Sequence, residues 1–173
     1  HVPVEVSYNP MVLDEPRKVL HLISATRLSQ EKGYDRMLKL AKALKKADIP
    51  YIWNVFTYDK VDEEYFSRCK VTFDIANYIA DADALVQLSD SEAYCYSVRE
   101  ALVLGTPCIT TDLPTFREIG VEEGKTGWLL PLDMSTIPVE SIYKGLPPFR
   151  CKDVDDVYDE LLGAEKSTYI MIA

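Results

Sequence analysis

Glycine is scarce in this chain, with seven residues among 173. None of the seven forms a G-x-G-x-x-G fingerprint or a Walker loop, the two glycine-rich motifs that many nucleotide-binding proteins wrap around a phosphate. These two routes to nucleotide binding are therefore excluded. A phosphate ligand would instead need well-placed cations and the main-chain amides at the start of a helix.

Histidine and paired cysteines are also scarce. The chain has two histidines, His1 and His21, and its four cysteines are scattered without a C-x-x-C pair (Cys69, Cys95, Cys108 and Cys151). A zinc site is therefore not expected, because such sites are built from closely spaced cysteine and histidine ligands. Reduced thiols of a cytosolic protein fit this spacing best.

Positive charge is in short supply as well. The sequence has 19 Lys and Arg against 28 Asp and Glu, a net charge of −9. Such an acidic chain is not expected to bind nucleic acid or anionic membranes in general. It also lacks an apolar run long enough to span a bilayer and a basic, apolar leader, which favours a cytoplasmic protein. Against this background, each cation near a candidate site is informative.

The chain does contain short apolar runs that alternate with amphipathic segments. Strands are expected at residues 19–25, 51–56, 71–73, 84–88, 108–111 and 127–130. Helices are expected at residues 35–46, 97–104, 115–119 and 154–162, with a loop and a short helix over 58–70. The alternation predicts an α/β fold with a Rossmann-like, doubly wound and mostly parallel sheet. Residues 1–16 are interpreted as an inter-domain linker and leading strand, residues 17–173 as one domain, and His21 as a core residue.

Two glutamates, Glu92 and Glu100, have seven residues between them. Glu92 follows the expected strand 84–88, whereas Glu100 lies about one turn into the helix 97–104. In an open parallel sheet, ligands bind in the crevice beyond the carboxyl ends of the strands. Carboxylates at two depths there could accept hydrogen bonds from the hydroxyls of a hexose and of a ribose. The alternative is a solvated glutamate at a helix start and an unrelated surface glutamate.

Two cations follow the first buried strand, at Arg27 and Lys32. Arg27 offers a flat fork of donors and Lys32 a point charge, and both precede a helix. The amides at the start of the helix 97–104 offer a second anion site. Together these groups could hold a diphosphate without a metal. The alternative is that both are ordinary surface cations in a loop.

Several short motifs occur in order along the chain, at residues 24–28 (SATRL), 31–33 (EKG), 91–102 (SE to EAL), 105–107 (GTP), 117–119 (REI) and 124–128 (GKTGW). From about Arg17 to Met134 the chain resembles the C-terminal, donor-binding half of the family-4 retaining glycosyltransferases of GT-B fold. The loop at residues 94–98 (YCYSV) is similar to that of the subgroup that builds bacterial capsules and other surface polysaccharides.

The resemblance implies transfer of a hexose from a UDP- or GDP-linked sugar to a saccharide or lipid-linked acceptor, with retention and without a metal cofactor. Glu92 would then contact the donor sugar and Glu100 the nucleotide ribose. Arg27 and Lys32 would hold the diphosphate. Backbone amides after the first glutamate would also meet the phosphate, and these belong to Cys95, Tyr96 and Ser97.

The chain departs from the family pattern in three places. Ala93 and Cys95 stand where the family often has Gly or Ser and Gly, and residues 73–77 (FDIAN) replace a usual glycine before the fourth strand. A side chain at position 95 limits how closely the backbone can approach a phosphate. The N-terminal domain that supplies acceptor contacts is absent, so the chain is interpreted as an excised donor-binding domain. The full-length enzyme would work in the cytoplasm, at the inner face of the membrane through its other domain.

Three other functions compete with this interpretation. Asp81 and Asp83 form an Asp-x-Asp pattern, the signature of metal-dependent glycosyltransferases of another fold. They are interpreted as turn or helix-end residues, because they precede the strand 84–88 rather than follow it. A sugar-nucleotide epimerase would share the fold and the pocket, and a flavodoxin-like regulatory module would share the fold alone. Tyr94 and Tyr96 are interpreted as half-buried loop residues, and Trp128 as core.

Overall fold

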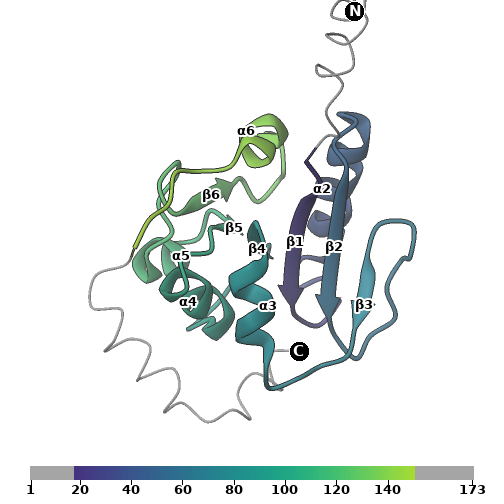
Figure 1. Cartoon of the computed structure of the whole chain (residues 1–173), viewed down its shortest axis with the longest axis horizontal. Helices are drawn as coiled ribbons and strands as arrows, with labels where there is room; N and C mark the ends of the chain where they lie inside the picture. Colours follow the sequence, from purple (N-terminus) through teal and green to yellow (C-terminus); the bar gives the residue numbers. More distant parts are fainter. Residues whose placement is uncertain (1–17, 151–173) are drawn as a thin grey trace, which may run out of the picture.

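Six parallel strands form the centre of the computed structural model, which describes residues 18–150 (Figure 1). The strands are β1 (Leu20–Ala25), β2 (Tyr51–Phe56), β3 (Ser67–Cys69), β4 (Ala84–Gln87), β5 (Cys108–Thr111) and β6 (Gly127–Leu130). The helices are α2 (Tyr34–Lys46), α3 (Ile75–Asp81), α4 (Tyr96–Val103), α5 (Pro114–Ile119) and α6 (Val139–Lys144).

The strand order β3-β2-β1-β4-β5-β6 confirms the predicted Rossmann-like, doubly wound fold. From β1 the chain builds outward to β3, then returns across the sheet to lay β4 against the other side of β1. Leu22 pairs with Ala84 and Ile23 with Leu85 at this junction. The carboxyl ends of β1 and β4 therefore lie side by side at the point where the winding reverses.

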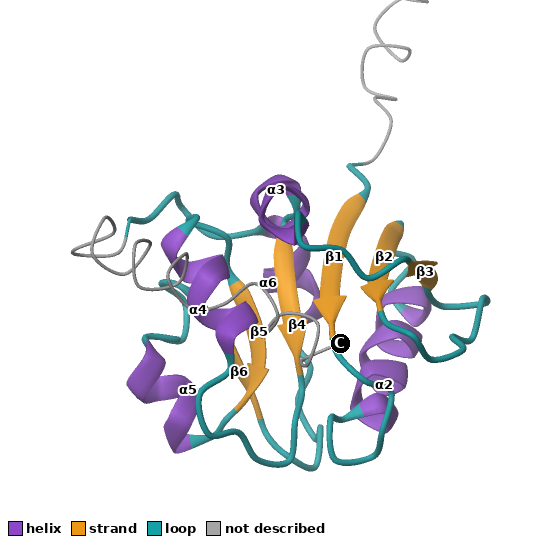
Figure 2. Cartoon of the chain, turned by 90° about the horizontal axis from the view of Figure 1, so that it is seen from below, coloured by secondary structure: helices purple, strands orange, loops and turns teal. Residues whose placement is uncertain are grey.

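Both faces of the sheet are buried, which explains why its central strands are almost continuously apolar. Leu22 and Val86 pack into one core cluster together with α2. The next residues along β1 and β4 point the other way, so that Ile23 packs into a second cluster with α3, α4 and α5. Figures 1 and 2 show helices on both faces of the sheet. Trp128 lies in the first cluster and is buried, as predicted.

The buried elements agree closely with the sequence prediction. The observed bounds of β2, β5 and β6 are the predicted ones. Those of β1, β4, α2 and α5 differ by one residue at one end, and α4 begins and ends one residue earlier than predicted. Each of these elements carries a strong apolar pattern because it contributes to one of the two core clusters. The helix predicted at residues 154–162 lies outside the described residues.

The prediction was wrong at the edge of the sheet. Residues 58–70 contain no helix, and the strand expected at 71–73 lies instead at Ser67–Cys69. This strand pairs with β2 through Asn54 and Ser67. An edge strand with exposed side chains has no apolar signature, so only its backbone pairing defines it. Helices α3 and α6 were not predicted at all, because each is short and buries few residues.

Candidate functional site

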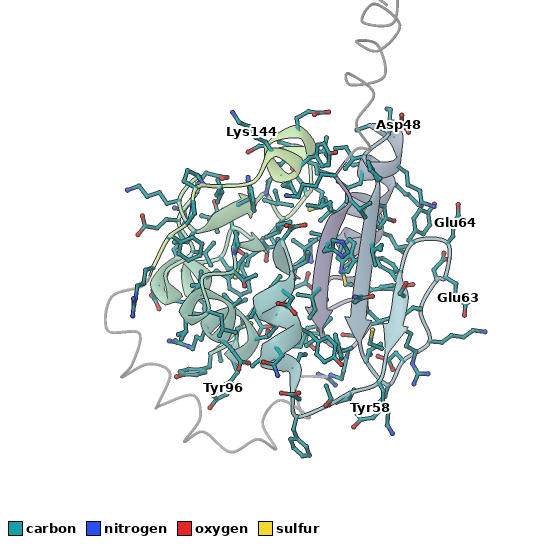
Figure 3. The ribbon with its side chains drawn as sticks, viewed as in Figure 1. Asp48, Tyr58, Glu63, Glu64, Tyr96 and Lys144 are labelled. Atoms are coloured by element: carbon teal, nitrogen blue, oxygen red, sulfur yellow. The ribbon has the colours of Figure 1, made fainter. Side chains whose placement is uncertain are left out.

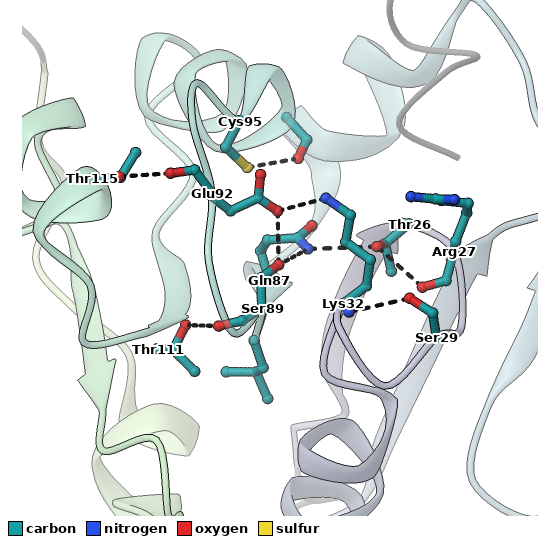
Figure 4. Close-up of polar contacts among 12 residues, drawn as sticks. Thr26, Arg27, Ser29, Lys32, Gln87, Ser89, Glu92, Cys95, Thr111 and Thr115 are labelled. Carbon is teal, nitrogen blue, oxygen red and sulfur yellow. Dashed lines mark hydrogen bonds and ion pairs between the residues drawn. The ribbon is translucent and has the colours of Figure 1, made fainter.

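Most of the residues proposed from the sequence gather in the loops that follow β1 and β4 (Figure 4). Arg27 and Lys32 lie between β1 and α2, and Glu92 lies between β4 and α4. Glu100 lies within α4, as predicted, and is 4% exposed. The two cations and the first glutamate therefore lie together at the carboxyl ends of β1 and β4, where the sequence predicted them.

Gly33 allows the two loops to approach each other. Its backbone has φ of 82°, and a Cβ atom built on it would stand 1.8 Å from the carbonyl oxygen of Leu88. A side chain could not be accommodated there, and the left-handed conformation disfavours one in any case. The contact presses the start of α2 against the residue after β4. It brings Lys32, which precedes Gly33, next to the loop that carries Glu92.

Lys32 and Glu92 form an ion pair, with 2.9 Å between Nζ and Oε1. Their side chains are 19% and 10% exposed, so the pair is partly shielded from solvent. The hydroxyl of Ser89 donates a hydrogen bond to the same Oε1, at 2.8 Å. Thr115 Oγ1 donates to the main-chain oxygen of Glu92, at 2.7 Å, and fixes the loop. The sequence predicted both residues at this edge but not their direct contact.

Arg27 contrasts with Lys32. Its side chain is exposed, and its guanidinium forms no hydrogen bond or ion pair within the part of the chain that the structure describes. The loop that carries it is nevertheless held, because the amide of Leu28 donates to Asp59 Oδ2 at 2.8 Å. Figure 4 shows Arg27 and Lys32 on the same side of Glu92. The site thus holds one engaged and one available cation.

The loop before α4 has an unusual backbone. Cys95 precedes the helix with φ of 54°, in the left-handed region that glycine adopts most readily, and no side chain caps the helix start. This conformation gives a physical reason for the glycine that the family often carries here. Burial, aided by the charge of Glu92, raises the pKa of the Cys95 thiol to about 12. The thiol stays protonated at neutral pH and is no nucleophile.

Tyr94, in the loop before α4, packs against Tyr96, the first residue of α4, with ring centroids 4.5 Å apart. Arg99 lies over the Tyr94 ring at 3.8 Å, and its Nε donates to the Tyr94 carbonyl oxygen at 3.1 Å. Both tyrosines are half-buried, as predicted. Their contacts make them part of the loop's own packing.

Two buried polar residues, Gln87 and Ser89, connect to the ion pair and were not predicted as site residues. Gln87 is the last residue of β4 and Ser89 follows two positions later; both are almost fully buried. The available signal was a glutamine within an otherwise apolar strand. A buried polar side chain needs hydrogen-bond partners, which indicates a polar network at that point.

Two surface hollows lie at opposite ends of the sheet. One of about 570 Å³ lies at the carboxyl end, beside the end of β2, and is lined largely by apolar and aromatic side chains that include Phe56, Phe73 and Tyr78. A larger one, of about 870 Å³, is lined by Asp48 and by residues at the start of β2. Figure 3 shows Asp48 and Tyr58 at opposite ends of this strand. The larger hollow is therefore remote from the cations and from Glu92.

The Asp-x-Asp pattern also lies at the amino end of the sheet. Asp83 accepts a hydrogen bond from the amide of His21, at 2.8 Å, and forms an ion pair with Lys18. Asp81 ends α3. Both carboxylates thus lie at the opposite end of β4 from Glu92, in agreement with their interpretation as turn or helix-end residues.

The prediction that His21 is a core residue was wrong, because its side chain is exposed. β1 first pairs with β4 at Leu22, so His21 lies just before the covered part of that face. Residues 18–150 contain no group of three or more His, Cys, Asp and Glu side chains that could hold a metal ion. Within the same range, no helix is long and apolar enough to cross a membrane.

Known proteins resemble this chain in sequence and in fold. The GtfA subunit of a UDP-N-acetylglucosamine–peptide N-acetylglucosaminyltransferase from Streptococcus gordonii is 28% identical over 136 residues, which are 71% of this chain and 26% of that protein. A putative colanic acid biosynthesis glycosyltransferase, WcaL of Escherichia coli K12, is 23% identical over 144 residues, 72% of this chain and 35% of that protein. This chain thus spans about a quarter to a third of these curated relatives.

Anabaena HepE, solved in complex with UDP and glucose, superposes with a TM-score of 0.59 at 15% identity, over 97% of this chain and 47% of that one. This likeness concerns the fold, which is that of the GT-B glycosyltransferases. A family model described as glycosyl transferases group 1 matches residues 10–135. That match covers most of the chain, and the chain therefore belongs to the group 1 glycosyl transferases.

Proposed function

We propose that this chain is the nucleotide-sugar-binding domain of a retaining glycosyltransferase. The whole enzyme would transfer a hexose from a UDP- or GDP-linked sugar to a saccharide or lipid-linked acceptor in surface polysaccharide synthesis. The observation that carries the proposal is the grouping of Arg27, Lys32 and Glu92 where the winding of the sheet reverses. Membership of the family and a relative named for colanic acid biosynthesis support it.

The diphosphate would lie between the β1 loop and the start of α4. Arg27 is exposed and has a planar fork of donors that matches phosphate oxygens. The helix start adds the partial positive charge of its amides, which belong to Cys95, Tyr96 and Ser97. Lys32 would join them once phosphate oxygens compete for its ammonium group. In an acidic chain, such a cluster of positive groups favours an anionic ligand.

Glu92 would bind the transferred sugar. Its carboxylate is partly shielded from solvent, which strengthens hydrogen bonds to sugar hydroxyls relative to those at an open surface. Glu100, deeper in α4, would accept hydrogen bonds from the ribose. The two carboxylates would thus recognise two different sugar rings of the same donor molecule.

The chemistry requires little from the protein beyond position and charge. As the bond between sugar and diphosphate breaks, negative charge grows on the leaving oxygen. Preorganised cations and amides stabilise that charge more than they stabilise the intact donor, which lowers the barrier. Acceptor binding falls to the domain that lies outside this chain, and any association with the membrane would also be through that domain.

The hollow of about 570 Å³ beside the end of β2 would receive the nucleotide base. Tyr78 packs against Phe56 with the two rings tilted and 5.1 Å between their centroids, and it is half exposed, so a base could contact its ring. Tyr78→Ala should weaken nucleoside diphosphate binding about fivefold, near the low end of measured base stacking on aromatic residues. Calorimetry can measure this, with Tyr58→Ala as a control because Tyr58 is exposed and does not line the hollow. Equal losses for both variants would exclude the hollow as the base site.

Thermal unfolding with a panel of nucleotide sugars tests the proposed function. UDP- or GDP-linked hexoses should raise the melting temperature of the chain, since a ligand that binds only the folded state stabilises it. Nucleosides without phosphate should raise it far less. A panel without any effect would leave a flavodoxin-like regulatory module as the better description.

Titration with a nucleoside diphosphate tests the absence of a metal requirement. Arg27, Lys32 and the helix amides already supply a positive field, so the dissociation constants should be similar in EDTA and in excess magnesium. A tenfold or greater change in the dissociation constant with magnesium would contradict this expectation. It would direct attention to Asp81 and Asp83 instead.

A further inference from the structure

The carboxylate of Glu92 rests on a buried chain of hydrogen bonds. Gln87 Nε2 lies 2.7 Å from Ser89 Oγ, and Ser89 Oγ lies 2.8 Å from Glu92 Oε1 (Figure 4). Gln87 is 2% exposed and Ser89 is not exposed at all. Water cannot easily substitute for either contact, so the chain of bonds is set by the protein alone.

The direction of these bonds follows from the number of protons. The hydroxyl of Ser89 has one hydrogen atom, and the ionised Glu92 can only accept. Because the Gln87 amide donates to Ser89 Oγ, the hydroxyl proton is directed to Glu92. With the Gln87 amide turned over, its oxygen would take that proton, and Ser89 Oγ and Glu92 Oε1 would be two acceptors 2.8 Å apart.

Gln87 also links the two strands on which the site is built. Its Nε2 atom lies 3.5 Å from Thr26 Oγ1, at the end of β1. The main-chain oxygen of Ser89 accepts a bond of 2.6 Å from Thr111 Oγ1, at the end of β5. Ser89 is therefore linked, directly or through Gln87, to three neighbouring strands, which limits the movement of the residue whose hydroxyl meets Glu92.

We propose that Ser89, oriented by Gln87, is a positioning residue that fixes the Glu92 carboxylate for the donor sugar. This inference rests on the proposed function. When the diphosphate draws Lys32 away, Glu92 Oε1 loses one partner and keeps the Ser89 hydroxyl. The carboxylate then stays aimed at the sugar and needs no reordering when the donor arrives, which preserves affinity.

The test compares two ligands on the full chain by calorimetry, a nucleoside diphosphate and the corresponding nucleotide sugar. Ser89→Ala should weaken binding of the nucleotide sugar by roughly three- to tenfold, the loss expected for one hydrogen bond. It should leave the nucleoside diphosphate within about twofold. In the Glu92→Gln background, Ser89→Ala should cause a much smaller further loss, because the two residues act through the same contact.

Two further variants separate positioning from simple packing. Gln87→Met should give the same sugar-specific loss, because it removes the donor that orients Ser89 while it keeps a side chain of similar length. Thr110→Val is the matched control: the Thr110 hydroxyl is also buried at the carboxyl end of the sheet but has no hydrogen-bond partner within residues 18–150. This substitution should change the affinity for neither ligand.

Two outcomes would overturn the inference alone. One is an equal loss for both ligands in Ser89→Ala, and the other is an undiminished loss in the Glu92→Gln background. Either would mean that Ser89 supports the loop in general. If the unmodified chain bound neither ligand, the proposed function itself would fail and the inference with it.

Discussion

Lys32→Ala should slow sugar transfer by the full-length enzyme roughly 100- to 1,000-fold, the range seen when one donor to a developing negative charge is removed. Arg27→Ala should act in the same direction. The structure adds an asymmetry, because Glu92 pairs with Lys32 and Arg27 has no partner among the described residues. Without Lys32, the uncompensated charge of Glu92 also repels the diphosphate. We therefore expect Lys32→Ala to weaken nucleoside diphosphate binding more than Arg27→Ala.

This explanation can be tested with a double substitution. Lys32→Ala combined with Glu92→Gln should recover part of the lost affinity for the nucleoside diphosphate, because the repulsive charge is gone. Lys125→Ala is the control, since the side chain of that lysine is 77% exposed and pairs with Glu122 at the surface.

Affinity of the unmodified chain for the nucleoside diphosphate should fall as salt is added, since mobile ions screen the attraction between the two cations and the phosphates. If Lys32→Ala and Arg27→Ala weakened binding of a nucleoside without phosphate as much as binding of the nucleoside diphosphate, the assignment of both cations to the diphosphate would be contradicted.

The sequence predicted that Arg27, Lys32 and Glu92 lie at one edge of the sheet, but it did not predict the contacts between them. Arg27, Lys32 and Glu92 could be placed at one edge because the carboxyl ends of parallel strands all face the same way. The ion pair between Lys32 and Glu92 depends on β1 and β4 being neighbours and on the close approach of Gly33 to Leu88. Neither fact can be read from local composition. Residues 60 positions apart meet only because the chain reverses its winding.

The same distinction explains which parts of the fold could be predicted. β6 was found at its observed bounds because both of its faces are buried, which leaves an apolar run. β5 contains two buried threonines and was found because it directly follows the helix-stop signal at residues 105–107. β3 could not be found, because two of its three side chains are exposed and its backbone pairing with β2 defines it. Gln87 looked like an interruption of an apolar strand. In the folded protein it is the polar link between β1, β4 and the loop of Glu92.

The two glutamates should give opposite results with the bare nucleoside diphosphate. Glu100→Gln should weaken both this ligand and the nucleotide sugar by about 1.5–3 kcal/mol, the contribution of hydrogen bonds to a charged group, since both ligands contain the ribose. Glu92→Gln should weaken only the nucleotide sugar. It should leave the nucleoside diphosphate bound at least as tightly as before, because the substitution frees Lys32 from its competing partner.

Calorimetry on the two single variants can resolve these differences, and Glu118→Gln provides the control because Glu118 is an exposed residue of α5. In the full-length enzyme, Glu92→Gln should also slow transfer if its contact tightens as the sugar approaches the transition state. The substitution conserves side-chain volume, so a large drop in melting temperature is not expected from Glu92, which lies in a loop. If both variants act alike on both ligands, the pair does not distinguish sugar from ribose. The two carboxylates would then have no separate roles in donor recognition, and the ion pair with Lys32 would be a structural link between the loops.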